Sequence, residues 1–291
     1  MPDEFRVNAA DGYDLGATLY RPPAGTVPSG ARVVVAAATG TPQRYYRKFA
    51  DFLASQGHEV VTFDYRGIGA SRPAGALRSF ETSFLQWGEV DFEAILQWSK
   101  AAGGETAVVG HSFGGHAFGM APSAQQTLGA YLFGTGTGHH AAMPLSEQPK
   151  VLALWNAVGP LLLARFGCLP GRYVGLGEDL PAGVFHQWKR WTSYKRYFFD
   201  DPTATFTERV ARLDRPIVAV NAADDRWATP ISAATLLQGY ASASIDLRIA
   251  EAAIGACGHM GYFRPGPGAT LWPDVHRWIH ALLAAKKARP Q

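Results

Sequence analysis

The stretch TAVVGHSFGGHAFGMA, residues 106–121, decides the fold. Residues 106–110 predict a strand and residues 114–121 a helix, so Ser112 falls on the turn between them within a Gly-x-Ser-x-Gly pattern. Side chains at the flanking glycine positions would collide with neighbouring backbone on so sharp a turn. The alternative is a glycine-rich turn with an incidental serine. The strand before it and the helix after it favour a nucleophile, with the N–H groups of the helix start placed beside it.

Strands and helices alternate on both sides of this stretch. The unbroken apolar run at residues 32–38 predicts a strand buried on both faces, as in a parallel sheet. Residues 5–9 and 15–21 predict an antiparallel hairpin at a sheet edge. The repeated β-α-β units imply an α/β fold class with a mostly parallel sheet of about eight strands flanked by helices. The predicted strands are 5–9, 15–21, 32–38, 59–65, 106–110, 130–133, 216–221 and 245–250, and the predicted helices are 43–56, 84–100, 114–121, 232–240 and 271–285.

Residues 135–206 have a different character. They carry many aromatic side chains among prolines and glycines, without the strand-helix rhythm. We expect a mainly helical cap insertion here, and a core made of residues 1–134 and 207–291. The cap aromatics either line an apolar pocket or form the cap's own small core, and the sequence leaves both open.

Composition excludes several classes of protein. Lys plus Arg number 27 against 24 Asp plus Glu, without a basic stripe interleaved with aromatics, so a nucleic-acid partner is not expected. Two cysteines do not make a disulfide framework and fit a reducing, cytoplasmic compartment. The longest apolar region, residues 151–166, is interrupted and shorter than the ~20 residues that cross a bilayer. Neither a phosphate loop nor a zinc spacing is evident, so we expect no metal and no cofactor. Oligomeric state stays open.

A serine hydroxyl needs a base, and nine histidines are available. His259 follows the strand 245–250, precedes the last helix and lies between glycines that let the backbone turn, so it is the predicted base. His111 adjoins the serine, but its side chain should point away from it. His276 and His280 are spaced i, i+4 on the terminal helix without a carboxylate between them, which favours a surface pair over a zinc site.

The carboxylate that orients the histidine should end the strand 216–221, which gives Asp224 or Asp225. Asp is also a common turn residue, so one of the two has that role.

The segment DYRGIGAS, residues 64–71, resembles the D-x-R-G-x-G-x-S segment of the α/β-hydrolase superfamily. With the serine, acid and histidine in order, the resemblance covers nearly the whole chain apart from the cap. Within the superfamily the chain is similar to a bacterial group of predicted serine hydrolases that share Thr-Gly-x-Pro-Gln after the third strand and an aromatic cap. The resemblance implies an α/β-hydrolase fold and a structural turn at residues 64–71. It also favours Asp225, because residues 226–230 resemble the stretch after the acid in relatives.

An oxyanion hole needs backbone N–H donors. Phe113, directly after the serine, supplies the first. The resemblance places the second in the loop after the strand 32–38, where most relatives have His-Gly and this chain has Thr-Gly. We expect Thr41 to be that donor, with Gly40 next.

These residues predict a serine hydrolase that cleaves a small apolar carboxylic ester or thioester through an acyl-enzyme on Ser112. Cys257, two residues before His259, is interpreted as a small buried thiol. An acyltransferase or a cofactor-free lyase would use the same three residues. A catalytically inactive binding protein on this fold is the third hypothesis.

Overall fold

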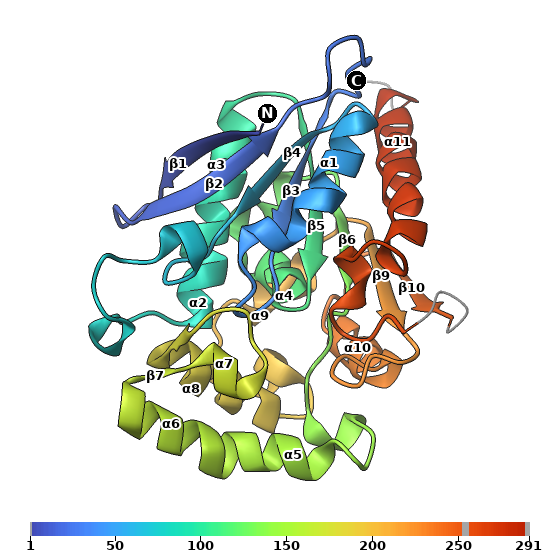
Figure 1. Ribbon diagram of the computed structural model, residues 1–291. Coiled ribbons are helices and arrows are strands. Elements are labelled where there is room, and N and C mark those ends of the chain that lie inside the picture. The colour runs from blue at the N-terminus through green and yellow to red at the C-terminus, as the bar shows by residue number, and fades with distance from the viewer. Residues whose placement is uncertain (1, 252–255, 289–291) are drawn as a thin grey trace.

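The structure is a computed structural model that describes residues 2–251 and 256–288. An eight-stranded sheet forms its centre, in the order β1-β2-β4-β3-β5-β6-β9-β10 (Figure 1). β1 and β2 form an antiparallel hairpin, β2 also pairs antiparallel with β4, and all remaining pairs are parallel. The predicted mostly parallel sheet with an antiparallel edge is therefore confirmed. The strands are β1 (Asp3–Asn8), β2 (Asp14–Tyr20), β3 (Ala31–Ala36), β4 (Glu59–Phe63), β5 (Glu105–His111), β6 (Ala130–Phe133), β9 (Ile217–Ala222) and β10 (Ile245–Ala250).

The central strands are apolar because both faces of the sheet are covered. Every residue of β3, β6 and β9 is buried, whereas β10 at the edge is exposed over most of its length. α1 and α11 lie together on one face, and α3 and α4 lie on the other (Figure 1). The core helices are α1 (Arg47–Ser55), α2 (Phe84–Gln86), α3 (Glu93–Ala101), α4 (Phe113–Met120), α9 (Thr207–Arg212), α10 (Pro230–Leu237) and α11 (Trp272–Ala288).

The helix predicted at residues 84–100 contains a π-helical turn, Trp87–Phe92, between α2 and α3. Its fully buried Asp91 accepts hydrogen bonds from the backbone N–H and the guanidinium of Arg66, at 2.9 and 2.7 Å. Hydrophobic periodicity carries no signal for a polar contact between residues 25 positions apart, and from the sequence we therefore expect a regular helix here.

The segment 135–206 lies across the carboxyl ends of the strands (Figure 1). Its elements are mainly helical, as expected, with one small pair of antiparallel strands. The division of the chain into core and cap stays a prediction. The elements are α5 (Gln148–Ala153), α6 (Gly159–Phe166), β7 (Cys168–Leu169), α7 (Gly171–Val174), β8 (Leu180–Pro181) and α8 (Ala182–Ser193).

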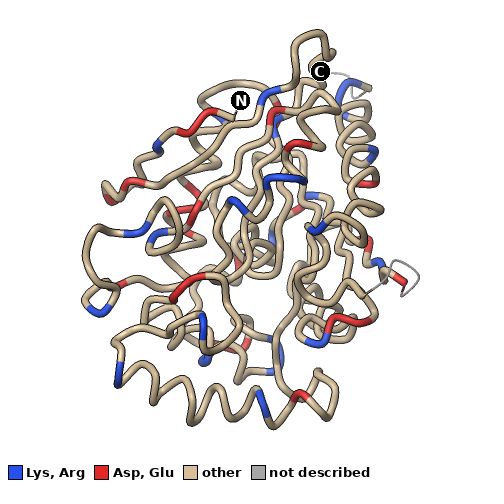
Figure 2. The backbone as a smooth tube through the Cα atoms, in the orientation of Figure 1, with Lys and Arg blue, Asp and Glu red and all other residues tan. Residues whose placement is uncertain are grey.

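Charged residues of both signs are interspersed along the backbone (Figure 2). Among the described residues, no helix combines the length and the apolar character that crossing a membrane requires.

Buried histidines make stability depend on pH, and two of them, His111 and His116, lie near Ser112 in the chain. Burial lowers the pKa of His111 to about 3 and that of His116 to about 4, whereas both groups protonate near pH 6.5 in the unfolded chain. Their stabilising contribution is therefore complete above pH 6.5 and is lost as the pH falls below it. We expect each to cost ~2 kcal/mol of unfolding free energy at pH 5 relative to pH 7.5.

Urea denaturation at the two pH values measures this loss. His116→Gln, which cannot titrate, should remove the ~2 kcal/mol that His116 contributes to this loss. The same pH dependence in His116→Gln as in the wild type would contradict the prediction.

Candidate active site

Ser112 occupies a strained turn between β5 and α4. Its φ and ψ are 51° and −111°, and it is one of two non-glycine residues with positive φ in the described chain. A Cβ at Gly110 would lie 2.7 Å from the backbone nitrogen of Gly115, and one at Gly114 would overlap the carbonyl of Ala36. The glycines therefore let three backbone segments pack closely, and the serine hydroxyl is exposed at the carboxyl end of β5.

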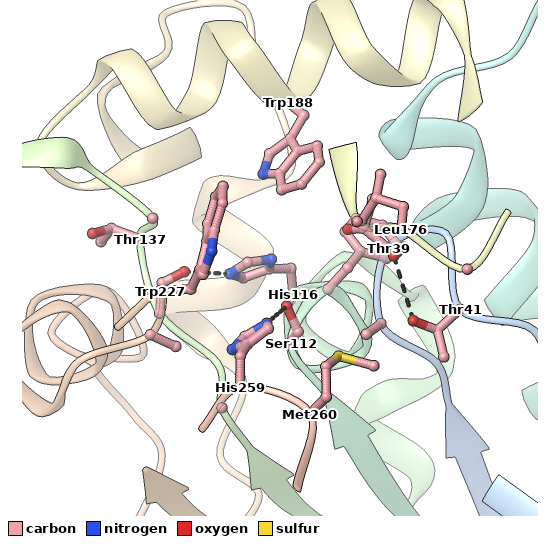
Figure 3. Close-up of a pocket in the computed structure, with 18 of the residues that line it drawn as sticks. Thr39, Thr41, Ser112, His116, Thr137, Leu176, Trp188, Trp227, His259 and Met260 are labelled. Carbon is pink, nitrogen blue, oxygen red and sulfur yellow. Dashed lines mark hydrogen bonds between the residues drawn. The ribbon is translucent and has the colours of Figure 1, made fainter. Parts of the chain in front are cut away.

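The structure brings Ser112, His259 and Asp225 together. The serine Oγ lies 3.0 Å from His259 Nε2, within hydrogen-bond distance (Figure 3). On the other side of the ring, His259 Nδ1 lies 2.9 Å from Asp225 Oδ2 and 3.2 Å from Oδ1. This chain of contacts lets the imidazole accept the serine proton while the carboxylate stabilises the imidazolium that forms.

Asp225 is 1% exposed and is surrounded by donors. Its Oδ1 accepts the backbone N–H groups of Trp227 and Ala228, both at 2.9 Å. Burial by itself raises the pKa of Asp225, but the charge of His259 and the hydrogen bonds to His259, Ala228 and Trp227 outweigh it and lower the pKa. The carboxylate is therefore ionised at neutral pH. Asp224, the alternative, instead accepts the backbone N–H of Gly258 at 2.9 Å.

Tyr262 and His111 position Asp225 and His259, although the sequence did not single out either residue for the site. The hydroxyl of Tyr262 accepts the N–H of Ala222 at 2.7 Å and donates to Asp225 Oδ2 at 3.0 Å. The ring of His111 points away from Ser112, as expected, and its Nε2 donates to the carbonyl of His259 at 2.8 Å. Tyr262 and His111 thus hold the carboxylate and the histidine loop in place. Both contacts join residues far apart in the chain. For His111, its position directly before Ser112 was a signal in the sequence, whereas Tyr262 had none.

The three expected oxyanion donors differ in their surroundings. Phe113 begins α4, so its N–H has no acceptor one turn earlier within the helix and lies beside the serine. Thr41 lines the same cavity as Ser112, but its N–H donates to the carbonyl of Ala38 at 3.1 Å. Gly40, with φ +63°, packs against Leu176, Glu178 and Leu180 instead. Phe113 is the best-placed donor, and Thr41 would have to share its N–H.

A cavity of about 190 Å³ opens above Ser112 and His259. Its walls come from the core loops and from the segment 135–206, which contributes Leu176, Trp188 and Tyr197 among others (Figure 3). Other aromatics of that segment, such as Phe185 and Trp191, are fully buried away from the cavity. Both interpretations of the aromatic segment therefore hold, each for different residues.

The other motifs are structural in this fold. Asp64 accepts the backbone N–H groups of Gln43 and Ala70, at 2.7 and 2.9 Å, and so closes the turn at residues 64–71. Cys257 is buried, and burial raises its pKa to about 12. A thiol with so high a pKa is a poor nucleophile.

Comparison with known proteins agrees with this architecture. A family model described as "Alpha/beta hydrolase family" matches residues 33–270. No curated protein matches the sequence.

Solved structures with a similar fold include monoglyceride lipase from Saccharomyces cerevisiae, in complex with a substrate analogue. It is 19% identical, with a TM-score of 0.68, and the match covers 97% of this chain and 96% of the lipase. Est816, an N-acyl homoserine lactone degrading enzyme, is 20% identical with a TM-score of 0.59, covering 93% and 99% of the two chains. The Pyrococcus furiosus esterase Pf2001 is 12% identical with a TM-score of 0.57, covering 98% and 92%. Such identities establish the fold alone; the family-model match, which spans most of the chain, establishes that the protein belongs to the alpha/beta hydrolase family.

Proposed function

We propose that the protein is a serine hydrolase that cleaves a carboxylic ester or thioester through an acyl-enzyme on Ser112. The observation that carries the proposal is the continuous contact from Ser112 Oγ through His259 to Asp225, at 3.0 and 2.9 Å, at the floor of a cavity. A serine hydroxyl with a base in hydrogen-bond reach, and an acid that orients the base, is the arrangement that nucleophilic acyl transfer requires.

Each step uses groups of this chain. Ser112 Oγ attacks the substrate carbonyl carbon while its proton moves to His259 Nε2. The oxyanion accepts a hydrogen bond from the N–H of Phe113. It also accepts one from the N–H of Thr41 when that group turns away from the carbonyl of Ala38. His259 then protonates the departing alkoxide or thiolate, which leaves the acyl group on the serine. Water, deprotonated by His259, releases the acid and restores the hydroxyl.

A small apolar acyl group fits the cavity. Its lining includes Val174, Leu176 and Trp188, beside backbone of glycine-rich loops. The similar structures include a monoglyceride lipase and an N-acyl homoserine lactone degrading enzyme, which both act on acyl compounds by their names. We extend that chemistry to this chain.

A panel of p-nitrophenyl esters and acyl-thioesters, combined with a fluorophosphonate probe, tests the function. We expect turnover of short-chain members and covalent labelling of Ser112. Neither turnover nor labelling, under conditions that label an ordinary esterase, would favour a binding protein. Faster acyl transfer to a dilute added alcohol than to water would instead identify an acyltransferase.

Trp188→Ala should change acyl-chain selectivity. The indole lies against Trp227 and Phe84, at centroid distances of 5.8 and 6.1 Å, and lines the cavity. Since each buried methylene contributes ~0.8 kcal/mol, removing this wall should lower kcat/KM for the best acyl chain roughly tenfold, through KM, and affect acetyl esters little.

Tyr173→Ala is the matched control, because Tyr173 lies in the same segment, is 55% exposed and does not line the cavity. An equal loss for all chain lengths in Trp188→Ala would contradict a role in acyl-chain binding.

A further inference from the structure

Three histidine rings meet where the last helix packs beside the start of β4. His58 directly precedes β4, and His276 and His280 are one turn apart on α11. One ring nitrogen of each lies within 4.8 Å of the other two, and His58 Nε2 is 3.1 Å from His276 Nδ1. The ring centroids are 4.4 to 5.6 Å apart. The i, i+4 pair expected on the surface is thus joined by a third imidazole from a position 218 residues earlier than His276.

The buried member of this cluster is oriented by a further hydrogen bond. His58 has no exposed surface, and its Nδ1 lies 2.7 Å from Ser29 Oγ. When Nδ1–H donates to that oxygen, the lone pair of Nε2 points at the other two rings. Metal-binding histidines show the same feature, in which a hydrogen bond at one nitrogen fixes the tautomer at the other.

We propose that His58, His276 and His280 bind a divalent transition metal ion of the zinc class, with solvent in the fourth position. Imidazole nitrogens suit Zn²⁺ and its neighbours, whereas Ca²⁺ and Mg²⁺ require oxygen ligands. Two nitrogens ~2.0–2.1 Å from a tetrahedral Zn²⁺ lie a little over 3 Å apart, which the 3.1 Å separation of His58 and His276 nearly matches. His280 is exposed, so the ion has an entry path and the fourth position is open to water.

The site would fasten α11 to the sheet. Arg277, beside His276, forms an ion pair with Asp274, which offsets its charge near the incoming cation. None of the three histidines lines the cavity of Ser112, so the ion has a structural role and the inference does not depend on the proposed hydrolysis.

Titration of tag-free, chelator-treated protein with Zn²⁺ against a chromogenic indicator tests the site. We expect about one equivalent bound in the low micromolar range or tighter. The melting temperature should rise by roughly 4–8 °C at a hundredfold excess of free Zn²⁺ over Kd. Mg²⁺ at the same concentration should have no such effect.

His276→Ala/His280→Ala should abolish this binding, and His280→Ala alone, at an exposed helix position, should weaken it at least about tenfold. The matched control is His139→Ala/His140→Ala, which removes two histidines whose ring centroids are equally close, at 4.5 Å, from another part of the chain. Wild-type protein without a bound equivalent, or a loss in the control as large as in His276→Ala/His280→Ala, overturns the proposal.

Discussion

Ser112→Ala is expected to lower kcat on any ester substrate by about 10⁴- to 10⁶-fold and to abolish fluorophosphonate labelling. The substitution removes the hydroxyl group alone, so binding of substrate should persist and KM should change little. Residual turnover above the uncatalysed rate would come from the N–H of Phe113 and from the cavity that holds the substrate.

Folding should be unaffected, because alanine retains the Cβ that the serine already carries at φ 51°. Ser193→Ala, at an exposed position of α8, is the control for loss of a hydroxyl away from the cavity and should retain full activity. If Ser112→Ala keeps more than about a hundredth of the wild-type rate while remaining folded, the acyl-enzyme mechanism on this serine is wrong.

The sheet and the position of Ser112 were predictable from local patterns. A sharp strand-to-helix turn demands glycine where a side chain has no room, and the apolar run of β3 demands burial on both faces. Each constraint leaves its signature within a few residues of sequence, as glycines on both sides of Ser112 and as an unbroken apolar run, so local patterns reveal it. The structure has the expected fold class, with an antiparallel hairpin at the edge of a mostly parallel sheet, and it brings Ser112 and His259 into contact.

Contacts between distant side chains were not predictable in the same way. Tyr262 reaches Asp225 across 37 residues, and His58 reaches His276 across 218. Each is polar, single and without a periodic signature, so neither hydrophobic pattern nor spacing reveals it. The π-helical turn at Trp87–Phe92 also contains such a contact, because its buried Asp91 accepts hydrogen bonds from Arg66.

Asp225→Asn should lower kcat by about 10³- to 10⁴-fold without unfolding the protein. Oδ1 of Asp225 accepts two backbone N–H groups, from Trp227 and Ala228, so the oxygen of an asparagine amide must stay on that side. Its NH₂ group then replaces Oδ2 and donates to His259 Nδ1. The imidazole is forced into the tautomer with its proton on Nε2, which faces Ser112 and cannot accept the serine proton.

Asp224→Asn separates this tautomer effect from a general disturbance of the loop. Among residues 2–251 and 256–288, Asp224 accepts a hydrogen bond only from the N–H of Gly258, which an amide oxygen also accepts. We therefore expect less than about a tenfold loss of kcat in Asp224→Asn. Steady-state kinetics and the rate of fluorophosphonate labelling, measured on both variants at pH 7.5, should show the difference. Equal losses of kcat in the two variants would contradict the tautomer effect. That effect requires direct contact with the imidazole of His259, and of the two carboxylates it is Asp225 that has this contact. The loss would then come from a disturbance of residues 257–262.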